Sequence, residues 1–363
     1  MNLENHYELT ELASFTIRRL QFMNEQGVLT QALPSFADEK TLLDLYRLMH
    51  LTRAGDEKAV KLQRTGKLGT YPASTGQEAI SVGIGHAMTA NDVFCPYYRD
   101  QGTLIQRGVD FEDIYANWGG YESSNLIPDA INPHDFPVSV PIASQFQYAA
   151  GVAFAMAYKE ENNAVLATGG EGSTSEGDFH EAINLAGSQQ LPLVVVINNN
   201  QWAISVPRQA QTGSDTIAQK AIGAGLDCVQ VDGNDVIAVR EAVAHALQCA
   251  RTERKPALIE AVSYRLCDHT TADDFSRYAD KDALEKAKEA EPIARLRRYL
   301  IEKNLWDDAR EQSMLKEIND SIQASAQRYL DRPKPQIDEM FNHTFGNLPK
   351  QLQQQRDLAK EGY

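Results

Sequence analysis

Residues 164–206 of this chain read AVLATGGEGSTSEGDFHEAINLAGSQQLPLVVVINNNQWAISV. The apolar run at residues 164–168 ends in two glycines, as a buried strand does where it meets a tight turn. Apolar residues at helical spacing follow, with Gly187 as the expected end of the helix, and a second apolar run covers residues 193–197. Its uninterrupted β-branched residues are typical of a parallel strand that is covered on both faces. The stretch therefore predicts a β-α-β unit of an α/β fold.

The two expected strands bring two oxygen-bearing side chains to one edge of the sheet. Glu171 follows the first strand and Asn200 follows the second. Parallel strands joined by a helix end at a common edge, where open α/β sheets bind ligands. Residues 172–175 add backbone N–H groups at an expected helix N-terminus, which suits a phosphate. Oxygen ligands beside a phosphate site favour Mg²⁺ or Ca²⁺ over zinc.

A plain β-α-β unit with a polar turn is the competing interpretation, because glycine-rich turns after strands are common. The stretch has no third glycine for a dinucleotide-binding fingerprint and no GxxxxGK of a P-loop. These two nucleotide-binding classes are therefore excluded here.

Composition limits the classes of function. The chain has 363 residues, enough for one large or two ordinary domains, and a net charge of −15 that argues against nucleic acid and anionic membranes as partners. Its four cysteines lack CxxC spacing, as is typical of a reducing compartment. No apolar run reaches the roughly 20 residues of a membrane span, and the acidic N-terminus resembles neither a signal nor a transit peptide. We therefore expect a cytoplasmic protein.

The GEG sequence, followed after the helix by LPLVVVINNNQWAIS, resembles the thiamine diphosphate motif, usually GDG with paired asparagines about 30 residues later. The flanking sequences EGDFHEAINLAG and QWAISVP resemble the alpha subunits of heterotetrameric 2-oxo acid dehydrogenases, the pyruvate and branched-chain enzymes. The resemblance extends over about residues 15–358. It implies a thiamine diphosphate-binding fold, which is α/β with a doubly wound, mostly parallel sheet.

The resemblance implies the ligands of the cofactor and its metal. Mg²⁺ would be held by Glu171, Asn200 and the backbone carbonyl of Trp202. A glutamate stands where the family more often has an aspartate, and the run of three asparagines leaves the register open by one position, although the spacing favours Asn200. The motif residues beside the cofactor are Gly170, Glu171, Gly172 and Ser173.

Further cofactor contacts follow from the same resemblance. Tyr98 and Arg99, at the end of a strand expected at residues 92–98, would contact the diphosphate, which a guanidinium suits. Val140 and Ile142 would touch the aminopyrimidine ring through backbone groups, and Ile142 would be the wedge that bends the cofactor. Ile142 could equally be a plain core isoleucine.

The polar loop YRLCDHTTADDFSRY carries the catalytic candidate, His269. The resemblance implies that this histidine lies over the cofactor and assists acyl transfer to lipoamide, and an imidazole titrates near neutral pH and can donate to an oxyanion. Arg265 of the same loop would meet the diphosphate. The loop departs from the family pattern at Cys267, Asp268 and Ala279.

We expect three regions. Residues 1–37 form a helical N-terminal arm with a short extended segment at TIRRLQF, residues 38–280 the α/β core, and residues 281–363 a helical region that packs between subunits. Within the core, a helix begins after Asp38 and ends at Gly66, with Leu42, Leu45, Met49 and Val60 on its apolar face. A capping box at Thr75-x-x-Glu78 opens the next helix. Residues 119–137 form a long loop, and residues 228–262 form a second β-α-β unit.

The expected function is that of a pyruvate dehydrogenase alpha subunit, which oxidatively decarboxylates pyruvate with thiamine diphosphate and passes the acyl group to lipoamide. With only one diphosphate-binding motif, the chain is expected to need a beta subunit, in a heterotetramer of two alpha and two beta chains, and a lipoyl-bearing dihydrolipoyl acyltransferase. GKLGTYPASTGQEAI resembles pyruvate enzymes, whereas GEG resembles branched-chain (2-oxoisovalerate) enzymes. Two further functions fit the same motif: half of a different split thiamine enzyme, such as a transketolase, and a non-catalytic subunit that keeps the fold.

Overall fold

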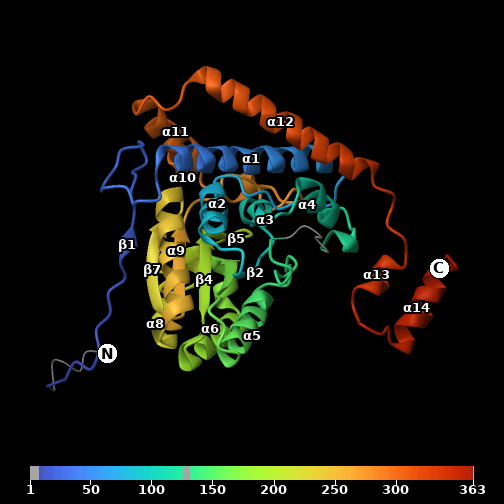
Figure 1. Ribbon diagram of the computed structural model, residues 1–363, viewed down its shortest axis with the longest axis horizontal. Coiled ribbons are helices and arrows are strands. Elements are labelled where there is room, and N and C mark those ends of the chain that lie inside the picture. Colours follow the sequence, from blue (N-terminus) through green and yellow to red (C-terminus); the bar gives the residue numbers. More distant parts are fainter. Residues whose placement is uncertain (1–7, 126–130, 363) are drawn as a thin grey trace.

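The computed structural model describes residues 8–125 and 131–362, and its centre is a six-stranded sheet with helices on both faces (Figure 1). The strand order is β1-β7-β8-β4-β3-β2, and every neighbouring pair is parallel. The strands are β1 Arg19–Leu20, β2 Val93–Cys95, β3 Val165–Gly170, β4 Leu193–Asn199, β7 Asp227–Asp232 and β8 Ala257–Val262. The predicted α/β class and both predicted β-α-β units are confirmed.

Two helical layers cover the sheet because successive strand residues point to opposite faces. Val165 and Val195 pack with one layer, whereas Leu166 and Val194 pack with the other. The first layer consists of α5 Ser144–Tyr158, α6 Gly177–Gln189 and α8 Gln219–Ala224, and the second of α2 Glu78–Ala87 and α9 Val236–Glu253. Burial on both faces explains why these strands read as uninterrupted apolar runs.

A third apolar cluster lies around α1, Glu39–Arg64, which runs horizontally above the sheet in Figure 1. Asp38 caps this helix by accepting from the Thr41 N–H at 2.8 Å, and Gly66 follows its end with a φ of +70°. Of the four apolar residues predicted to share a face, Leu42, Leu45 and Met49 are buried and Val60 is partly buried. The predicted helix is confirmed.

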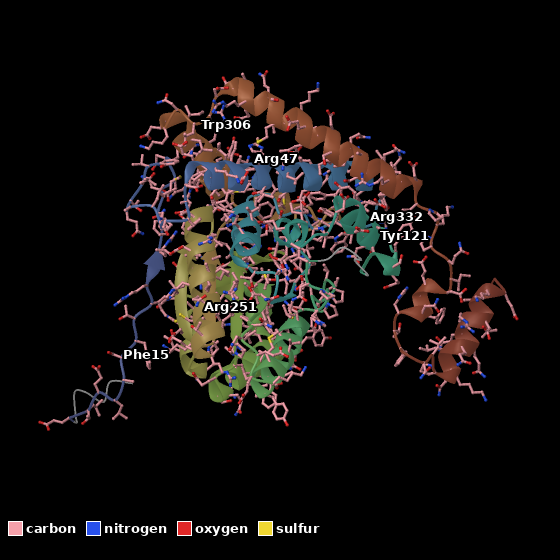
Figure 2. The ribbon with its side chains drawn as sticks, in the orientation of Figure 1. Phe15, Arg47, Tyr121, Arg251, Trp306 and Arg332 are labelled. Atoms are coloured by element: carbon pink, nitrogen blue, oxygen red, sulfur yellow. The ribbon has the colours of Figure 1, made fainter. Side chains whose placement is uncertain are left out.

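Helices of the C-terminal region pack on α1 within the same chain. These are α11 Pro292–Glu302 and α12 Asp308–Asp331, which runs beside α1 (Figures 1 and 2). Arg332, directly after α12, pairs with Glu112 at 2.7 Å and Asp113 at 2.6 Å. The shorter remaining helices are α3 Gln101–Gln106, α4 Phe111–Trp118, α7 Arg208–Gln211, α10 Lys281–Glu289, α13 Glu339–Asn342 and α14 Lys350–Lys360. Within the described ranges, no helix is both long and apolar enough to cross a membrane.

The arm contains no helix in residues 8–38, so the expectation of a helical arm is wrong and that of an extended segment is confirmed. Its strand β1 adds to the edge of the sheet beside β7. The N–H groups of Phe22 and Met23 donate to the Asp235 carboxylate at 2.7 and 2.8 Å. Because the arm's backbone finds these partners on the core, an extended conformation is favoured over a helix.

The expected capping box at the start of α2 is also wrong. Gln77, not Thr75, occupies the position before the helix, and it makes no capping bond with its side chain. The buried Glu78 carboxylate instead accepts from the Gly76 N–H at 3.0 Å and pairs with Arg53 at 2.7 Å. A buried charge needs such a partner, and this requirement decides the local geometry.

Gly187 lies inside α6 rather than at its end, which corrects the predicted helix boundary. A Cβ atom at this position would lie 1.8 Å from the carbonyl oxygen of Ala224, so only glycine allows the close approach of α6 to α8. We expect Gly187→Ala to lower the free energy of unfolding by about 1–3 kcal/mol through overpacking. Denaturant unfolding measures this change.

Gly223→Ala on α8 is the matched control, because a Cβ atom there meets nothing within 4 Å. This variant should be neutral or slightly more stable than the wild type. Equal stability of the two variants would contradict the packing argument.

Candidate active site

A cavity of about 330 Å³ opens where β3 and β4 end, at the sheet edge predicted from the sequence. It is bounded by these strand ends, the segment before α5, the hairpin of β5 Trp202–Ala203 and β6 Val206–Pro207, and the loop after β8. Eleven of the twelve residues expected to bind the cofactor line it: Tyr98, Arg99, Val140, Ile142, Gly170, Glu171, Gly172, Ser173, Asn200, Trp202 and His269. Arg265 lies behind His269.

Glu171 is the buried carboxylate of this cavity, with a side chain that is only 1% exposed. Its Oε2 accepts from the Asn200 N–H at 3.3 Å, whereas its Oε1 has no hydrogen-bond partner in the described structure. Burial raises the pKa of Glu171 to about 7. An unpaired buried carboxylate is costly, so this position favours a proton or a bound cation.

The three consecutive asparagines have separate environments, which bears on the choice of register. Asn198 and Asn199 use their side chains in hydrogen bonds inside the protein and do not line the cavity. Asn200 lines it beside Glu171, and its Oδ1 accepts from the Trp202 N–H at 3.2 Å. The geometry thus favours the same register as the spacing in the sequence.

The turn after β3 differs from the expected helix N-terminus. Residues 171–175 form a separate short 3₁₀ helix, η3 Glu171–Ser175, and α6 begins only at Gly177. A Cβ atom at Gly172 would lie 2.8 Å from the Cβ of Ala203, so glycine is required where η3 meets the β5–β6 hairpin. The backbone N–H groups at the cavity therefore belong to a tight turn rather than to the first turn of α6.

One buried guanidinium group lines the cavity and a second lies behind His269, and neither has an acidic partner among its hydrogen bonds. Arg99, 2% exposed, donates to the carbonyl oxygens of Ala73 and His269. Arg265, 0% exposed, donates to two backbone carbonyls and to the hydroxyl of Tyr278. Because all these partners are neutral, the positive charges remain available to an anion in the cavity.

His269 lies between these two arginines. Its Nδ1 is 3.3 Å from Arg99 Nη2 and 3.4 Å from Arg265 Nη1, and guanidinium nitrogens can only donate. Nδ1 therefore accepts, and Nε2 carries the hydrogen. Burial, followed by the charges of Arg99 and Arg265, lowers the pKa of His269 to about 3. The expectation that this imidazole titrates near neutral pH is wrong, although the neutral ring remains a donor through Nε2.

Tyr98 lies in the segment between β2 and α3, and its side chain packs beside His269. Its ring is edge-on to the His269 ring, with centroids 6.2 Å apart, and the Arg99 guanidinium carbon lies 5.5 Å from its centre. The preceding strand is shorter than predicted and ends at Cys95. The chain turns there because the Tyr97 N–H donates to the Asp100 carboxylate at 3.0 Å.

Val140 and Ile142 line the open side of the cavity and are 53% and 49% exposed. This exposure contradicts the interpretation of Ile142 as a core residue. The residue after Ile142, Ala143, has a φ of +70° and leads directly into α5. The backbone is thus turned sharply at the rim, with two large apolar side chains left partly uncovered.

Several polar residues of the cavity were not predicted from the sequence: Tyr97, Ser139, Gln145, Glu176 and Gln211. Behind the cavity, Gln77 Oε1 accepts from the side chains of Asn198 and Asn200 at 2.8 and 2.9 Å. Gln77 lies 123 positions before Asn200 in the chain. No local spacing reveals such a contact, because only the packing of α2 against the sheet creates it.

The fold and the cavity define an α/β protein with a cavity at one edge of its parallel sheet, lined by a buried carboxylate and a buried guanidinium group. Residues 46–338 match the family described as "Dehydrogenase E1 component". This match covers most of the chain, so the chain belongs to the dehydrogenase E1 component family, which implies the use of thiamine diphosphate.

Named relatives agree with this assignment. The chain is 37% identical over 328 residues to the pyruvate dehydrogenase E1 component subunit alpha of Acholeplasma laidlawii, covering 89% of this chain and 94% of that protein. It is 35% identical to the corresponding Mycoplasma genitalium protein, covering 89% and 90%. It is also 36% identical to the 3-methyl-2-oxobutanoate dehydrogenase subunit alpha of Mycobacterium tuberculosis (strain H37Rv), covering 96% and 95%.

Proposed function

We propose that this chain is the alpha subunit of a pyruvate dehydrogenase, which binds thiamine diphosphate and Mg²⁺ in the cavity and acts together with a beta subunit. The observation that carries this proposal is a buried carboxylate oxygen, Glu171 Oε1, that has no partner in the described structure, together with two nearby buried guanidinium groups whose hydrogen-bond partners are neutral. A cation at the first and a diphosphate at the second would satisfy both.

The residues at the carboxylate fit Mg²⁺. Glu171 Oε1, the Asn200 side-chain oxygen and the Trp202 carbonyl are hard oxygen donors of the kind this ion prefers. Glu171 and Asn200 follow adjacent strands and line the same cavity. No group of three or more His, Cys, Asp or Glu side chains in the described ranges could hold a metal. The proposed set differs from such clusters because it has one acidic side chain.

The residues beside it fit the diphosphate. Arg99 lines the cavity with its charge uncompensated, and Arg265 reinforces this charge from behind His269. A fork of guanidinium donors matches phosphate oxygens in geometry as well as in charge. Gly170, Gly172 and Ser173 supply the turn on which the diphosphate would rest, with Tyr98 beside Arg99.

When bound, thiamine diphosphate supplies the carbon nucleophile and the electron sink for decarboxylation of a 2-oxo acid. His269 would present its Nε2 hydrogen to negative charge that develops on oxygen, because Nδ1 is held as an acceptor by the two arginines. Val140 and Ile142 would hold the aminopyrimidine ring at the rim, with Ile142 as the wedge.

The cavity is open on the side of Val140 and Ile142, so the chain alone provides only part of the site. Exposed apolar residues on that side, Ile204 and Val206 among them, would be covered by the beta subunit in a heterotetramer of two alpha and two beta chains. A lipoyl-bearing dihydrolipoyl acyltransferase would take the acyl group. The four free cysteines agree with a reducing, cytoplasmic location.

We further propose a division into an arm (1–37), a cofactor-binding core (38–280) and a C-terminal helical region (281–363). The apolar clusters support this division only in part, because α11 and α12 pack on α1 of the core. The exposed helix α14, which has no buried residue, is then the segment best placed to contact another subunit.

The choice of substrate is tested by oxidative decarboxylation with the co-purified beta subunit, thiamine diphosphate, Mg²⁺ and an artificial electron acceptor. We expect a higher kcat/KM for pyruvate than for 2-oxoisovalerate. The reverse preference would assign the branched-chain function. The 36% identity to the 3-methyl-2-oxobutanoate dehydrogenase subunit alpha supports this alternative. Inactivity with both acids, in a folded heterotetramer that binds cofactor, would favour a non-catalytic subunit.

A further inference from the structure

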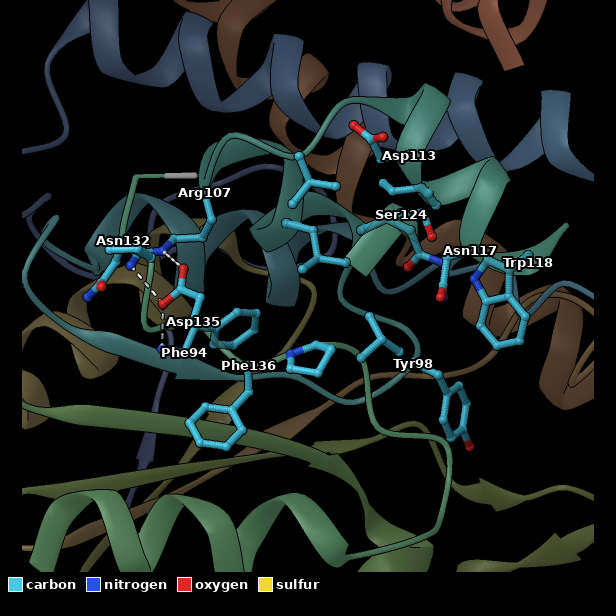
Figure 3. Close-up of a pocket in the computed structure, with 17 residues that line it drawn as sticks. Phe94, Tyr98, Arg107, Asp113, Asn117, Trp118, Ser124, Asn132, Asp135 and Phe136 are labelled. Atoms are coloured by element: carbon cyan, nitrogen blue, oxygen red, sulfur yellow. Dashed lines mark hydrogen bonds and ion pairs between the residues drawn. The ribbon is translucent and has the colours of Figure 1, made fainter. Parts of the chain in front are cut away.

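We propose that a second cavity, behind Tyr98, binds a compact uncharged molecule with a mostly apolar surface. This cavity has a volume of about 320 Å³ and lies between the end of β2, the helices α3 and α4, and residues 132–138 (Figure 3). Tyr98 lines both this cavity and the candidate active site. One aromatic ring therefore separates the two.

The walls of the second cavity are largely apolar. They include Phe94, Leu104, Val109, Ile114, Trp118 and Phe136. The volume lies within the range of sites for small ligands, which are concave and mostly apolar with a few polar groups. Apolar surface without contacts forfeits dispersion energy, so a molecule that fits this space gains affinity from it.

The charges at the second cavity exclude an anion. Arg107 is the only basic residue among the described residues that line it. Its guanidinium donates to both carboxylate oxygens of Asp135, at 2.8 and 3.0 Å (Figure 3). It also donates to the backbone carbonyls of Thr89 and Asp92. The other acidic lining residue, Asp113, pairs with Arg332 at 2.6 Å. With its cation already neutralised, the cavity offers nothing to a 2-oxo acid or a phosphate.

The buried amide of Gln101 gives a ligand no hydrogen-bond partner. This residue is 1% exposed, and its Nε2 donates to the Tyr71 hydroxyl at 3.2 Å and to the Pro72 carbonyl at 3.0 Å. Its Oε1 has no partner in the described structure, but the atom is fully buried, so a molecule in the cavity does not reach it. The ligand class is therefore a small uncharged aromatic or branched aliphatic compound.

Occupation of this cavity would act on the active site through Tyr98. The ring of Tyr98 lies edge-on to His269 and beside Arg99, so a ligand that packs against it restricts the wall of the cofactor cavity. This consequence rests on the proposed function, whereas binding in the second cavity does not.

The test is calorimetric titration of the full chain, co-purified with its beta subunit, with three probes. Indole and benzofuran are uncharged and have the expected shape, and benzoate carries a negative charge. We expect saturable binding of indole and of benzofuran, and no binding of benzoate, because the only basic residue among the described lining residues is already paired. Benzoate binding as tight as that of indole would overturn the proposal.

Two cavity-filling variants locate the binding. Leu104→Trp places an indole ring in the cavity and should weaken binding of the probe at least tenfold. Ile114→Phe, with a smaller insertion, serves if the first variant unfolds on heating. Indole binding that is absent from the wild type, or unchanged in both cavity-filling variants, would overturn the proposal. Because titration requires no turnover, failure of the pyruvate assay leaves this result unaffected.

Discussion

Replacement of Glu171 by alanine is expected to lower the affinity for thiamine diphosphate at limiting Mg²⁺ by about 100-fold or more, and to abolish measurable turnover. The physical reason is that Glu171 would be the sole charged ligand of the metal, and even residues that only support a metal ligand contribute about 10- to 100-fold in affinity. The measurement is a cofactor titration of the variant with its beta subunit, at fixed low Mg²⁺.

Glu176→Ala is the matched control, because this second glutamate lines the same cavity but is exposed. It should retain most of the wild-type affinity. Cofactor affinity in Glu171→Ala equal to that of the wild type at limiting Mg²⁺ would contradict the role as a metal ligand.

The raised pKa of Glu171, about 7, adds a dependence on pH. A proton competes with Mg²⁺ for the carboxylate, so metal affinity should fall as pH decreases below 7 and level off above it.

The stability of the metal-free chain should depend on pH in the opposite direction, decreasing as pH rises. The folded pKa exceeds the ordinary value of 4.5, so stability contributed by Glu171 is complete below pH 4.5 and is lost as pH rises through 7. Glu171→Gln removes this loss and should stabilise the metal-free chain at pH 8 by about 2–3 kcal/mol relative to the wild type.

Replacement of His269 by alanine is expected to reduce acyl transfer to lipoamide by about 10²- to 10³-fold, because a positioned donor to negative charge is lost. Reaction with an artificial electron acceptor should decrease less. Since Nε2 is assigned as the donor, glutamine, whose amide nitrogen reaches a similar position, should restore part of the rate, and asparagine should not. Separate assays with lipoamide and with the artificial acceptor measure the two steps.

His180→Ala on the exposed surface of α6 is the control and should match the wild type. The pKa of His269, about 3, predicts that no titration of this histidine appears in the rate of acyl transfer between about pH 5 and pH 8. Equal losses in both assays, or failure of glutamine to exceed asparagine, would contradict the assigned role and tautomer.

The β-α-β unit and the sheet edge where the cavity lies could be predicted because both depend on local information. Residues 165–170 and 193–199 are strands that begin with apolar runs, β-branched in the second, and the helix between them forces the strands to be parallel. Glu171 and Asn200 then lie at one edge whatever the rest of the chain does. Boundaries were less predictable. Gly187 remains inside α6 because Ala224 lies against it, and Thr75 does not cap α2 because Arg53 holds Glu78.

By itself, the sequence determined the fold class and, through its resemblance to the family, eleven residues of the cavity. Of these, the glycine turn, Glu171 and Asn200 also follow from a short pattern of residue types at set spacing. Only the tertiary structure decided the electrostatic state of the site. Arg99 and Arg265 come from different segments, and their convergence on Nδ1 makes His269 a neutral donor through Nε2. Burial, which depends on the packing of the whole chain, raises the pKa of Glu171 and leaves its Oε1 without a partner in the described structure. The second cavity behind Tyr98 likewise exists only because α3 and α4 fold over residues 132–138, and no spacing within one segment encodes that contact.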